Sequence, residues 1–202
     1  MVLQEVGLDQ TLATGAPRIR SFLIDMNTLF EQFLERVLGL ALLPDGIRVE
    51  VQRSDSIFWR PDDRTRYARV RPDLLLRRPE RPNARLPVDA KYKRYDLGRV
   101  NVDDLSQAFL YAYAYRDPEA AGAPCALLVH PAESAGEPRT TPIQVRSVAE
   151  RIVDAELGVV AIHIPTILDE VDAGGGPGLA ALREAALDAL PMRPASGLRV
   201  VA

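Results

Sequence analysis

The chain has 202 residues, 47% of them hydrophobic, which is enough for one domain with a substantial core. Its formal net charge of −3 does not point to a nucleic-acid partner. No window of about 18 apolar residues predicts a transmembrane helix, and the first residues lack the charged start and apolar run of a signal peptide. The single cysteine, Cys125, excludes an internal disulfide. Together these features predict a cytoplasmic protein without a membrane span.

The charges are unevenly distributed along the chain. Residues 47–99 carry fifteen Lys or Arg and eight Asp or Glu, a balance of about +7. The other residues carry ten basic and twenty acidic side chains, about −10. Such a basic segment is either a solvated surface whose arginines pair with nearby acids or an electrostatic footprint for a polyanion, and the charges alone favour neither reading.

The first half of the chain is predicted to hold one helix and several strands. Residues 1–20 are expected to form a poorly ordered leader. Apolar residues recur at helical spacing over 22–42 and predict an amphipathic helix, which a Pro-Asp-Gly turn at 44–46 ends. Residues 47–52 alternate like a strand, and 54–66 predict a polar loop or hairpin tip. Strands are expected over 67–78 and 86–92, joined by a hairpin connection rich in Pro and Asn.

The second half predicts a buried helix, more strands and a helical tail. Residues 102–116 are apolar almost all round a helix, which is typical of a well-buried one. Strands are expected at 125–130, 141–148 and 157–164. A helix, a glycine-rich break and an alanine-rich helix over about 178–190 follow. This order of elements predicts an α/β fold with a mixed β-sheet flanked by helices and a helical C-terminal extension.

One strand carries an acid and a base one residue apart. Because residues i and i+2 of a strand point to the same face, Asp89 and Lys91 project together. Asp73 opens the preceding strand and approaches Asp89 if the two strands pair. Two such carboxylates repel each other unless a cation such as Mg²⁺ lies between them. With Lys91 to bind phosphate or assist a water, this set suits metal-assisted phosphodiester hydrolysis; the alternative is an exposed ion pair.

Other polar and aromatic residues have two readings each. Glu31 lies on the shoulder of the apolar stripe of the first helix, so it either has a partner there or reaches solvent. Gln107 is either part of the site or a buried amide bonded to backbone. Trp59 is expected to fold onto the core, with contact to DNA as the alternative. The tyrosines at 111, 113 and 115 are expected to serve packing.

Taken in order, four motifs resemble a known family. They are LFE at 29–31, RPD at 71–73, VDAKYK at 88–93 and Asp-x-x-Gln at 104–107 followed by an aromatic-alanine run. This ordered set resembles the PD-(D/E)xK nuclease superfamily. More narrowly, it resembles the nuclease domain of the McrC family, the nuclease subunit of McrBC-type modification-dependent restriction systems. The resemblance covers about residues 20–165.

The resemblance implies a restriction-endonuclease-like fold, with a nuclease domain over 21–165 and a helical extension over 166–202. It implies that Mg²⁺, for which Mn²⁺ substitutes, is held by Asp73, Asp89 and the main-chain carbonyl of Ala90. Lys91 would be the catalytic lysine, Glu31 a supporting acid and Gln107 the glutamine that follows the core motif. Weaker expected nucleic-acid contacts are Lys93, Arg94 and Arg71.

The function that follows is a Mg²⁺-dependent DNA endonuclease of a McrBC-like restriction or anti-phage defence system. The expected partners are DNA, an AAA+ GTPase of the McrB type or another targeting subunit, and a second copy of the chain. Residues before 22 leave no room for the N-terminal motor-binding domain that McrC proteins usually carry, and the chain has no Walker motif of its own. The alternatives are a non-catalytic assembly module that docks an AAA+ or other partner, and a nuclease acting on RNA or single strands.

Overall fold

The computed structural model describes residues 25–62, 64–93, 95, 99–149 and 152–191. Four α-helices, one short 3-10 helix and eight strands lie in these ranges. In chain order they are α1 (Met26–Leu42), η1 (Leu43–Asp45), β1 (Arg48–Val51), β2 (Asp55–Trp59), β3 (Arg66–Val70), β4 (Leu74–Arg78), β5 (Arg81–Ala90), α2 (Val102–Ala114), β6 (Cys125–Pro131), β7 (Arg139–Arg146), β8 (Val153–Ile162), α3 (Ile164–Asp172) and α4 (Pro177–Ala189). The predicted turn after the first helix is confirmed, and Gly46 provides its left-handed residue with φ of 66°.

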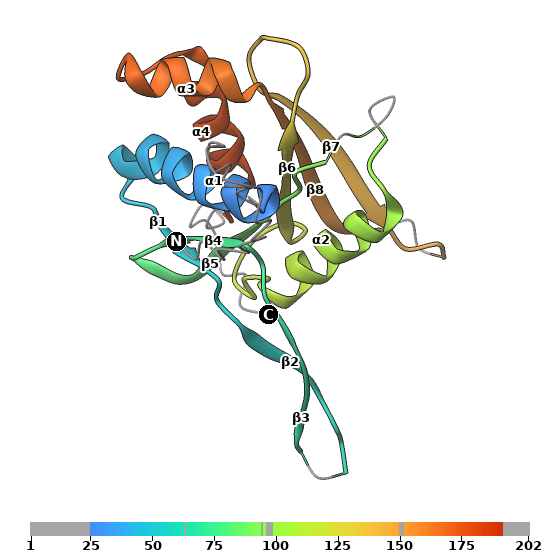
Figure 1. The fold of residues 1–202 in the computed structure, drawn as a ribbon. Helices are drawn as coiled ribbons and strands as arrows, with labels where there is room; N and C mark the ends of the chain where they lie inside the picture. The colour runs from blue at the N-terminus through green and yellow to red at the C-terminus, as the bar shows by residue number, and fades with distance from the viewer. Residues whose placement is uncertain (1–24, 63, 94, 96–98, 150–151, 192–202) are drawn as a thin grey trace, which may run out of the picture.

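A six-stranded sheet with the order β1-β4-β5-β6-β8-β7 organises the fold (Figure 1). The β5–β6 and β6–β8 pairs are parallel, whereas the β1–β4, β4–β5 and β8–β7 pairs are antiparallel. The prediction of a mixed sheet flanked by helices is therefore confirmed. β5 lies inside the sheet, so both of its edges are hydrogen-bonded.

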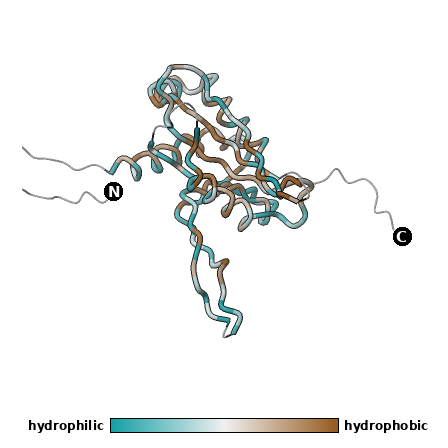
Figure 2. The backbone as a smooth tube through the Cα atoms, turned by 90° about the vertical axis from the view of Figure 1, so that its right-hand side faces the viewer, coloured by the Kyte–Doolittle hydropathy of each residue, from teal (hydrophilic) through white to brown (hydrophobic). Residues whose placement is uncertain are grey.

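Helices cover the two faces of the sheet separately (Figure 1). Along β4 and β5, every second residue points to the face covered by α1, including Leu76 and Val88. Leu75 points to the opposite face, where α2 contributes Tyr111 and Tyr115 to its surroundings. The α1 side chains that fill the core recur at helical spacing, as the sequence predicts: Phe30, Leu34, Val37, Leu38 and Leu42. Hydrophobic residues accordingly gather in the strands and the helix faces that pack on them (Figure 2).

The two C-terminal helices share this main core. Ile167, Leu182 and Ala186 are fully buried in the same cluster as the α1 side chains. The carboxylate of Glu170 accepts hydrogen bonds from the main-chain nitrogens of Gly178 at 2.9 Å and of the next residue at 2.7 Å. These bonds satisfy donors that the start of α4 leaves free, and they place a negative charge at the positive end of its dipole.

The prediction of one continuous strand over 67–78 is wrong. β3 ends at Val70 and β4 begins at Leu74, and the two strands belong to different sheets. Pro72 lies between them and has no N–H to offer a ladder, which favours a break there. β3 instead pairs with β2 in a separate two-stranded sheet, which projects from the body of the molecule (Figures 1 and 2).

Other strand boundaries also differ from the sequence predictions. The segment 54–66, expected to be a loop or hairpin tip, contains all of β2. β5 begins at Arg81 and ends at Ala90, so most of the predicted connection 79–85 is strand and the predicted strand end at 92 is not. Within the described residues, no helix combines the length and apolar character needed to cross a membrane.

Candidate active site

The antiparallel pairing of β4 and β5 brings two carboxylates together at one end of the ladder. Leu74 pairs with Val88, so the next step of the same register places Asp73 opposite Asp89. The Asp73 side chain also reaches across, because its Oδ2 accepts a hydrogen bond from the main-chain nitrogen of Ala90 at 2.7 Å. Two acids separated by 15 residues in the sequence are thereby fixed on adjacent strands.

Asp89 is the most deeply buried acid of the site. Its residue is 2% exposed, and its Oδ2 lies 2.8 Å from Nζ of Lys91. This is an ion pair by distance, but its geometry does not make a hydrogen bond to Oδ2, which remains a buried oxygen without a hydrogen-bond donor. Burial raises the pKa of Asp89 to about 7, with the nearby negative charge of Asp73 adding to the rise and Lys91 opposing it.

Lys91 is held from two sides. Besides the contact with Asp89, its Nζ donates a hydrogen bond to Oε1 of Gln107 at 2.9 Å. Burial alone would lower the pKa of Lys91, but contact with Asp89 and its negative charge outweigh this, so the pKa is raised. The Lys91 ammonium group is therefore a cation held in place beside the carboxylate of Asp89.

A hydrogen-bonded chain continues from Lys91 into the fold. Nε2 of Gln107 donates to the hydroxyl of Tyr111 at 2.8 Å, and that hydroxyl donates to the carbonyl oxygen of Arg71 at 3.0 Å. The chain thus closes on the residue two positions before Asp73. Gln107 and Tyr111 are four residues apart on α2, and this i, i+4 spacing was the signal in the sequence that could have assigned Tyr111 to the site. The expectation that Tyr111 serves only packing is incomplete, since its hydroxyl fixes Gln107.

Glu31 approaches the same site from α1. It is partly exposed, and burial followed by the negative charge of Asp73 raises its pKa, whereas the charges of Arg71 and Lys91 lower it. Among the described residues, however, no group of three or more His, Cys, Asp or Glu side chains is arranged to hold a metal ion. Glu31 therefore lies within electrostatic reach of Asp73, but among the described residues it belongs to no three-carboxylate cluster.

The donor set nevertheless fits a hard dication. Asp73 and Asp89 provide carboxylates on adjacent strands, and Oδ2 of Asp89 is buried without a hydrogen-bond donor. Mg²⁺ commonly binds one or two carboxylates and completes its shell with waters and substrate phosphate. A main-chain carbonyl, such as that of Ala90, is a further oxygen ligand of the type that Mg²⁺ accepts, and it carries no charge.

The three residues expected to contact nucleic acid have different surroundings in the structure. Nζ of Lys93 lies 2.6 Å from Oδ2 of the buried Asp104, which also accepts a hydrogen bond from the hydroxyl of Tyr95 at 3.1 Å. β5 ends at Ala90 and the chain turns after it, so Lys93 lies beyond the strand. The Arg71 residue is exposed beside Asp73. Arg94 lies outside the described residues.

Trp59 does not fold onto the core as expected. It lies on β2, in the projecting two-stranded sheet, and 53% of the residue is exposed. Its neighbour across the ladder is Arg66, whose guanidinium lies 5.7 Å from the indole ring. The reason for the wrong prediction is the isolation of this hairpin, which no helix in the described part of the chain covers.

Comparison with known proteins identifies the family of the chain. A family model described as "McrBC 5-methylcytosine restriction system component" matches residues 1–131, more than half of the sequence. The chain belongs to the McrBC family. The resemblance predicted from the four sequence motifs is thereby confirmed at the level of this family, and the match includes the Asp73, Asp89 and Lys91 constellation.

Comparison with solved structures finds a likeness for this McrBC-family chain among chains of known structure. It matches a chain in a half-complex of the tetradecameric assembly of Thermococcus gammatolerans McrB AAA+ hexamers with bound McrC. The TM-score is 0.49 at 21% sequence identity, and the match covers 83% of this chain and 34% of that chain. The present chain therefore spans about a third of the length of the chain that it matches. No curated protein matches the sequence.

Proposed function

We propose that this McrBC-family chain is a Mg²⁺-dependent DNA endonuclease with the core of the PD-(D/E)xK nucleases. The observation that carries the proposal is the convergence of Asp73, Asp89 and Lys91 at one end of the β4–β5 ladder. A lysine bound by a glutamine and paired with a buried carboxylate is unnecessary for a solvent-facing strand. It suits a site that handles a phosphodiester, since developing negative charge there meets a fixed cation.

In this proposal Asp73, Asp89 and the carbonyl of Ala90 hold the metal. When bound, Mg²⁺ supplies charge neutralisation and Lewis acidity toward a phosphate oxygen and a water. Lys91 orients the attacking water and stabilises charge on the phosphate, and Gln107 holds its ammonium group in place. Glu31 contributes a further negative charge beside the metal-binding pair, with Arg71 exposed to meet the DNA backbone.

The partners are part of the proposal. The family description names a restriction system, and the matched structure contains McrB AAA+ hexamers with bound McrC. We infer that an AAA+ GTPase of the McrB type recruits or activates this chain on DNA. Because one such site cuts one strand, a double-strand break requires a second copy of the chain or two successive events.

The decisive experiment is cleavage of supercoiled plasmid, methylated and unmethylated, in Mg²⁺ or Mn²⁺. Wild type is compared with Asp89→Asn and Lys91→Gln, and exposed Arg36→Gln on α1 is the matched control. We expect metal-dependent cutting that each site variant reduces by at least about a hundredfold, since each removes a group that acts on the transition state. Cutting that survives both site substitutions refutes the assignment.

A second readout follows metal binding without turnover. Ca²⁺ or Mg²⁺ that binds only the folded state stabilises it in proportion to the logarithm of its concentration over its Kd. We therefore expect either ion to raise the thermal unfolding midpoint of wild type, and to leave that of Asp89→Asn unchanged. Equal midpoint shifts in both proteins would place the bound ion elsewhere.

The assay is repeated with a McrB-like AAA+ GTPase and GTP. Cutting that appears only with this partner identifies a subunit activated by its motor. Absence of cutting in every condition, together with stable binding to the AAA+ protein, assigns the chain to the alternative, a non-catalytic assembly module.

A further inference from the structure

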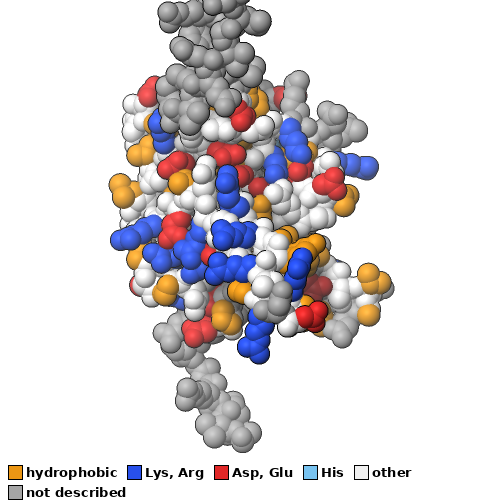
Figure 3. All heavy atoms as spheres, turned by 60° about the horizontal axis from the view of Figure 1, so that its bottom comes forward, with side chains coloured by type: hydrophobic (Ala, Val, Ile, Leu, Met, Phe, Trp, Pro, Cys, Tyr) orange, Lys and Arg blue, Asp and Glu red, His pale blue; other side chains and the backbone are white. Residues whose placement is uncertain are grey.

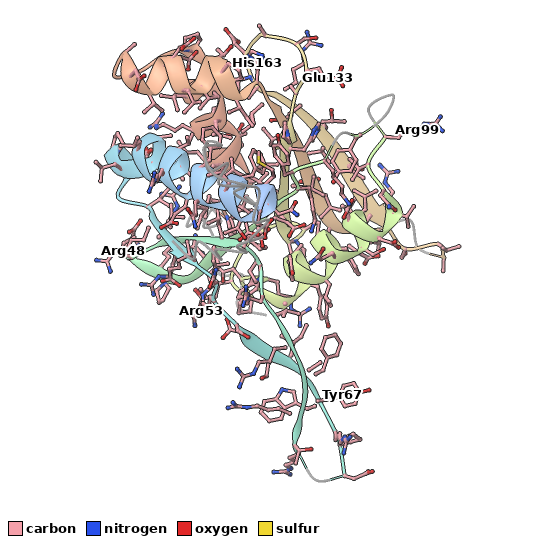
Figure 4. The ribbon with its side chains drawn as sticks, viewed as in Figure 1. Arg48, Arg53, Tyr67, Arg99, Glu133 and His163 are labelled. Carbon is pink, nitrogen blue, oxygen red and sulfur yellow. The ribbon has the colours of Figure 1, made fainter. Side chains whose placement is uncertain are left out.

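The β2–β3 hairpin is a separate arm on the molecule. It forms its own two-stranded sheet and projects beyond the six-stranded one, with Tyr67 lying well away from the body (Figure 4). Only its root is buried, where Ile57 and Val70 pack in the cluster of Tyr111 and Tyr115. Toward the tip the aromatic residues face solvent, and the exposed fractions are 40% for Phe58, 53% for Trp59 and 70% for Tyr67.

Arginines alternate with these aromatic rings. Arg60, Arg64, Arg66 and Arg69 are exposed, and among the described residues no carboxylate forms a salt bridge with any of them. Two of the guanidinium groups lie over rings of the same hairpin, Arg66 at 5.7 Å from Trp59 and Arg60 at 5.6 Å from Tyr67. The face from which the arm projects also carries many Lys and Arg side chains (Figure 3).

This composition selects one class of partner. An apolar protein groove would match the rings but leave four positive charges without partners. A nucleic acid matches both, since its phosphates attract the guanidinium groups and its sugars and bases offer surfaces for aromatic rings. A two-stranded β-ribbon also has the width that the major groove of duplex DNA admits.

The root of the arm is joined to the candidate active site on both sides. Before β2, the main-chain nitrogen of Gln52 donates to the carbonyl oxygen of Asp73 at 3.2 Å. After β3, the carbonyl of Arg71 accepts the hydrogen bond from Tyr111 that ends the chain starting at Lys91.

A third attachment holds the arm to α2. Arg53 Nε lies 2.9 Å from Oδ2 of Asp55, and the hydroxyl of Tyr115 donates to the same oxygen at 2.9 Å. With attachments to β4 and α2, the arm is positioned against the site.

We propose that the β2–β3 hairpin is a DNA-binding arm that holds duplex beside the scissile phosphate. Arg60, Arg66 and Arg69 contact phosphates, and Trp59 lies against the sugars and bases of the same segment. The inference rests on the proposed function for its substrate class. It adds a contact surface outside the residues that perform the reaction.

Trp59 provides a direct test because it is the only tryptophan in the 202 residues. Wild type is titrated with a short labelled duplex in Ca²⁺, following tryptophan emission and DNA anisotropy in the same sample. We expect the emission to change in step with the anisotropy, and both signals to reverse when salt is added. Binding without any change in emission, or absence of binding, overturns the inference.

The charge contribution is tested with a triple variant, Arg60→Gln, Arg66→Gln and Arg69→Gln. The matched control removes three exposed arginines on other elements, Arg36→Gln, Arg48→Gln and Arg139→Gln. We expect the arm variant to raise the Kd for duplex at low salt by roughly tenfold or more. We also expect the slope of log K against log salt to fall by roughly 0.9 for each lost phosphate contact, and the control to change both quantities far less.

The outcomes separate this inference from the proposed function. If wild type cuts DNA and the arm variant binds and cuts equally well, the arm is not a DNA contact although the nuclease assignment stands. If duplex binds through the arm but is never cut, the arm is a DNA contact and the nuclease assignment fails. Loss of binding to an AAA+ partner with DNA binding unchanged would assign the arm to a protein interface and refute the proposal.

Discussion

Replacing Tyr111 with Phe removes one hydroxyl from the centre of the hydrogen-bonded chain that orients Lys91. The residue is 6% exposed, and its hydroxyl makes two hydrogen bonds, one from Gln107 and one to the carbonyl of Arg71. Each bond contributes about 1 kcal/mol net, so the free energy of unfolding should fall by about 2 kcal/mol. For a domain of this size, that corresponds to a drop in the unfolding midpoint of roughly 4–8 °C.

The measurement is urea unfolding of wild type and Tyr111→Phe, with Tyr113→Phe as the matched control on the same helix. Tyr113 is 51% exposed and contacts Arg116, so its hydroxyl loss should change stability by less than about 0.5 kcal/mol. In a double-mutant cycle with Gln107→Leu, Tyr111→Phe should be less destabilising by about 1 kcal/mol, because one hydrogen bond is already absent. Equal losses for the two Phe variants would refute the chain described above.

Three further predictions test packing, capping and reactivity. In Gly158→Ala, the added Cβ would lie 2.6 Å from a buried leucine of β6, so the free energy of unfolding in denaturant should fall by about 1–3 kcal/mol. In the control Gly39→Ala, the added Cβ on helix α1 meets open space, so the free energy of unfolding should rise by roughly 0.5–1 kcal/mol. Glu170→Gln weakens the cap of α4 and should lower the free energy of unfolding by about 1 kcal/mol. The exposed control Glu184→Gln should leave the free energy of unfolding unchanged, and equal effects of the two variants would exclude the capping role. Burial raises the pKa of the Cys125 thiol from 9.0 to about 11, so its alkylation at pH 8 should be about a hundredfold slower in the folded chain than in urea, and a fast native rate would contradict this.

Local periodicity accounts for what the sequence predicted correctly. The helix at Met26–Leu42 follows from apolar residues at i, i+3 and i+4, and the shared face of Asp89 and Lys91 follows from the two-residue repeat of a strand. The position of Asp73 opposite Asp89 required only that two neighbouring strands pair through a short connection. Each of these inferences depends on residues close together in the chain.

The remaining features depend on contacts that no short window contains. The bend at Pro72 could be suspected, but nothing local indicated that β3 leaves the main sheet and pairs with β2. Trp59 was expected to be covered because the sequence does not reveal that none of the described helices packs over its hairpin. Lys93 forms an ion pair with the buried acid Asp104 on α2, a contact between separate elements. These are tertiary effects that override local pattern.

The hydrogen bond from the main-chain nitrogen of Ala90 to Oδ2 of Asp73 makes the carboxylate the last rung between β4 and β5. A side chain here takes the place that a backbone carbonyl normally occupies, so fraying of this strand end and loss of the site are the same event. Local openings of this kind span free energies from near zero up to that of global unfolding. Hydrogen exchange at the Ala90 amide consequently reports how often the contact between Asp73 and the end of β5 opens.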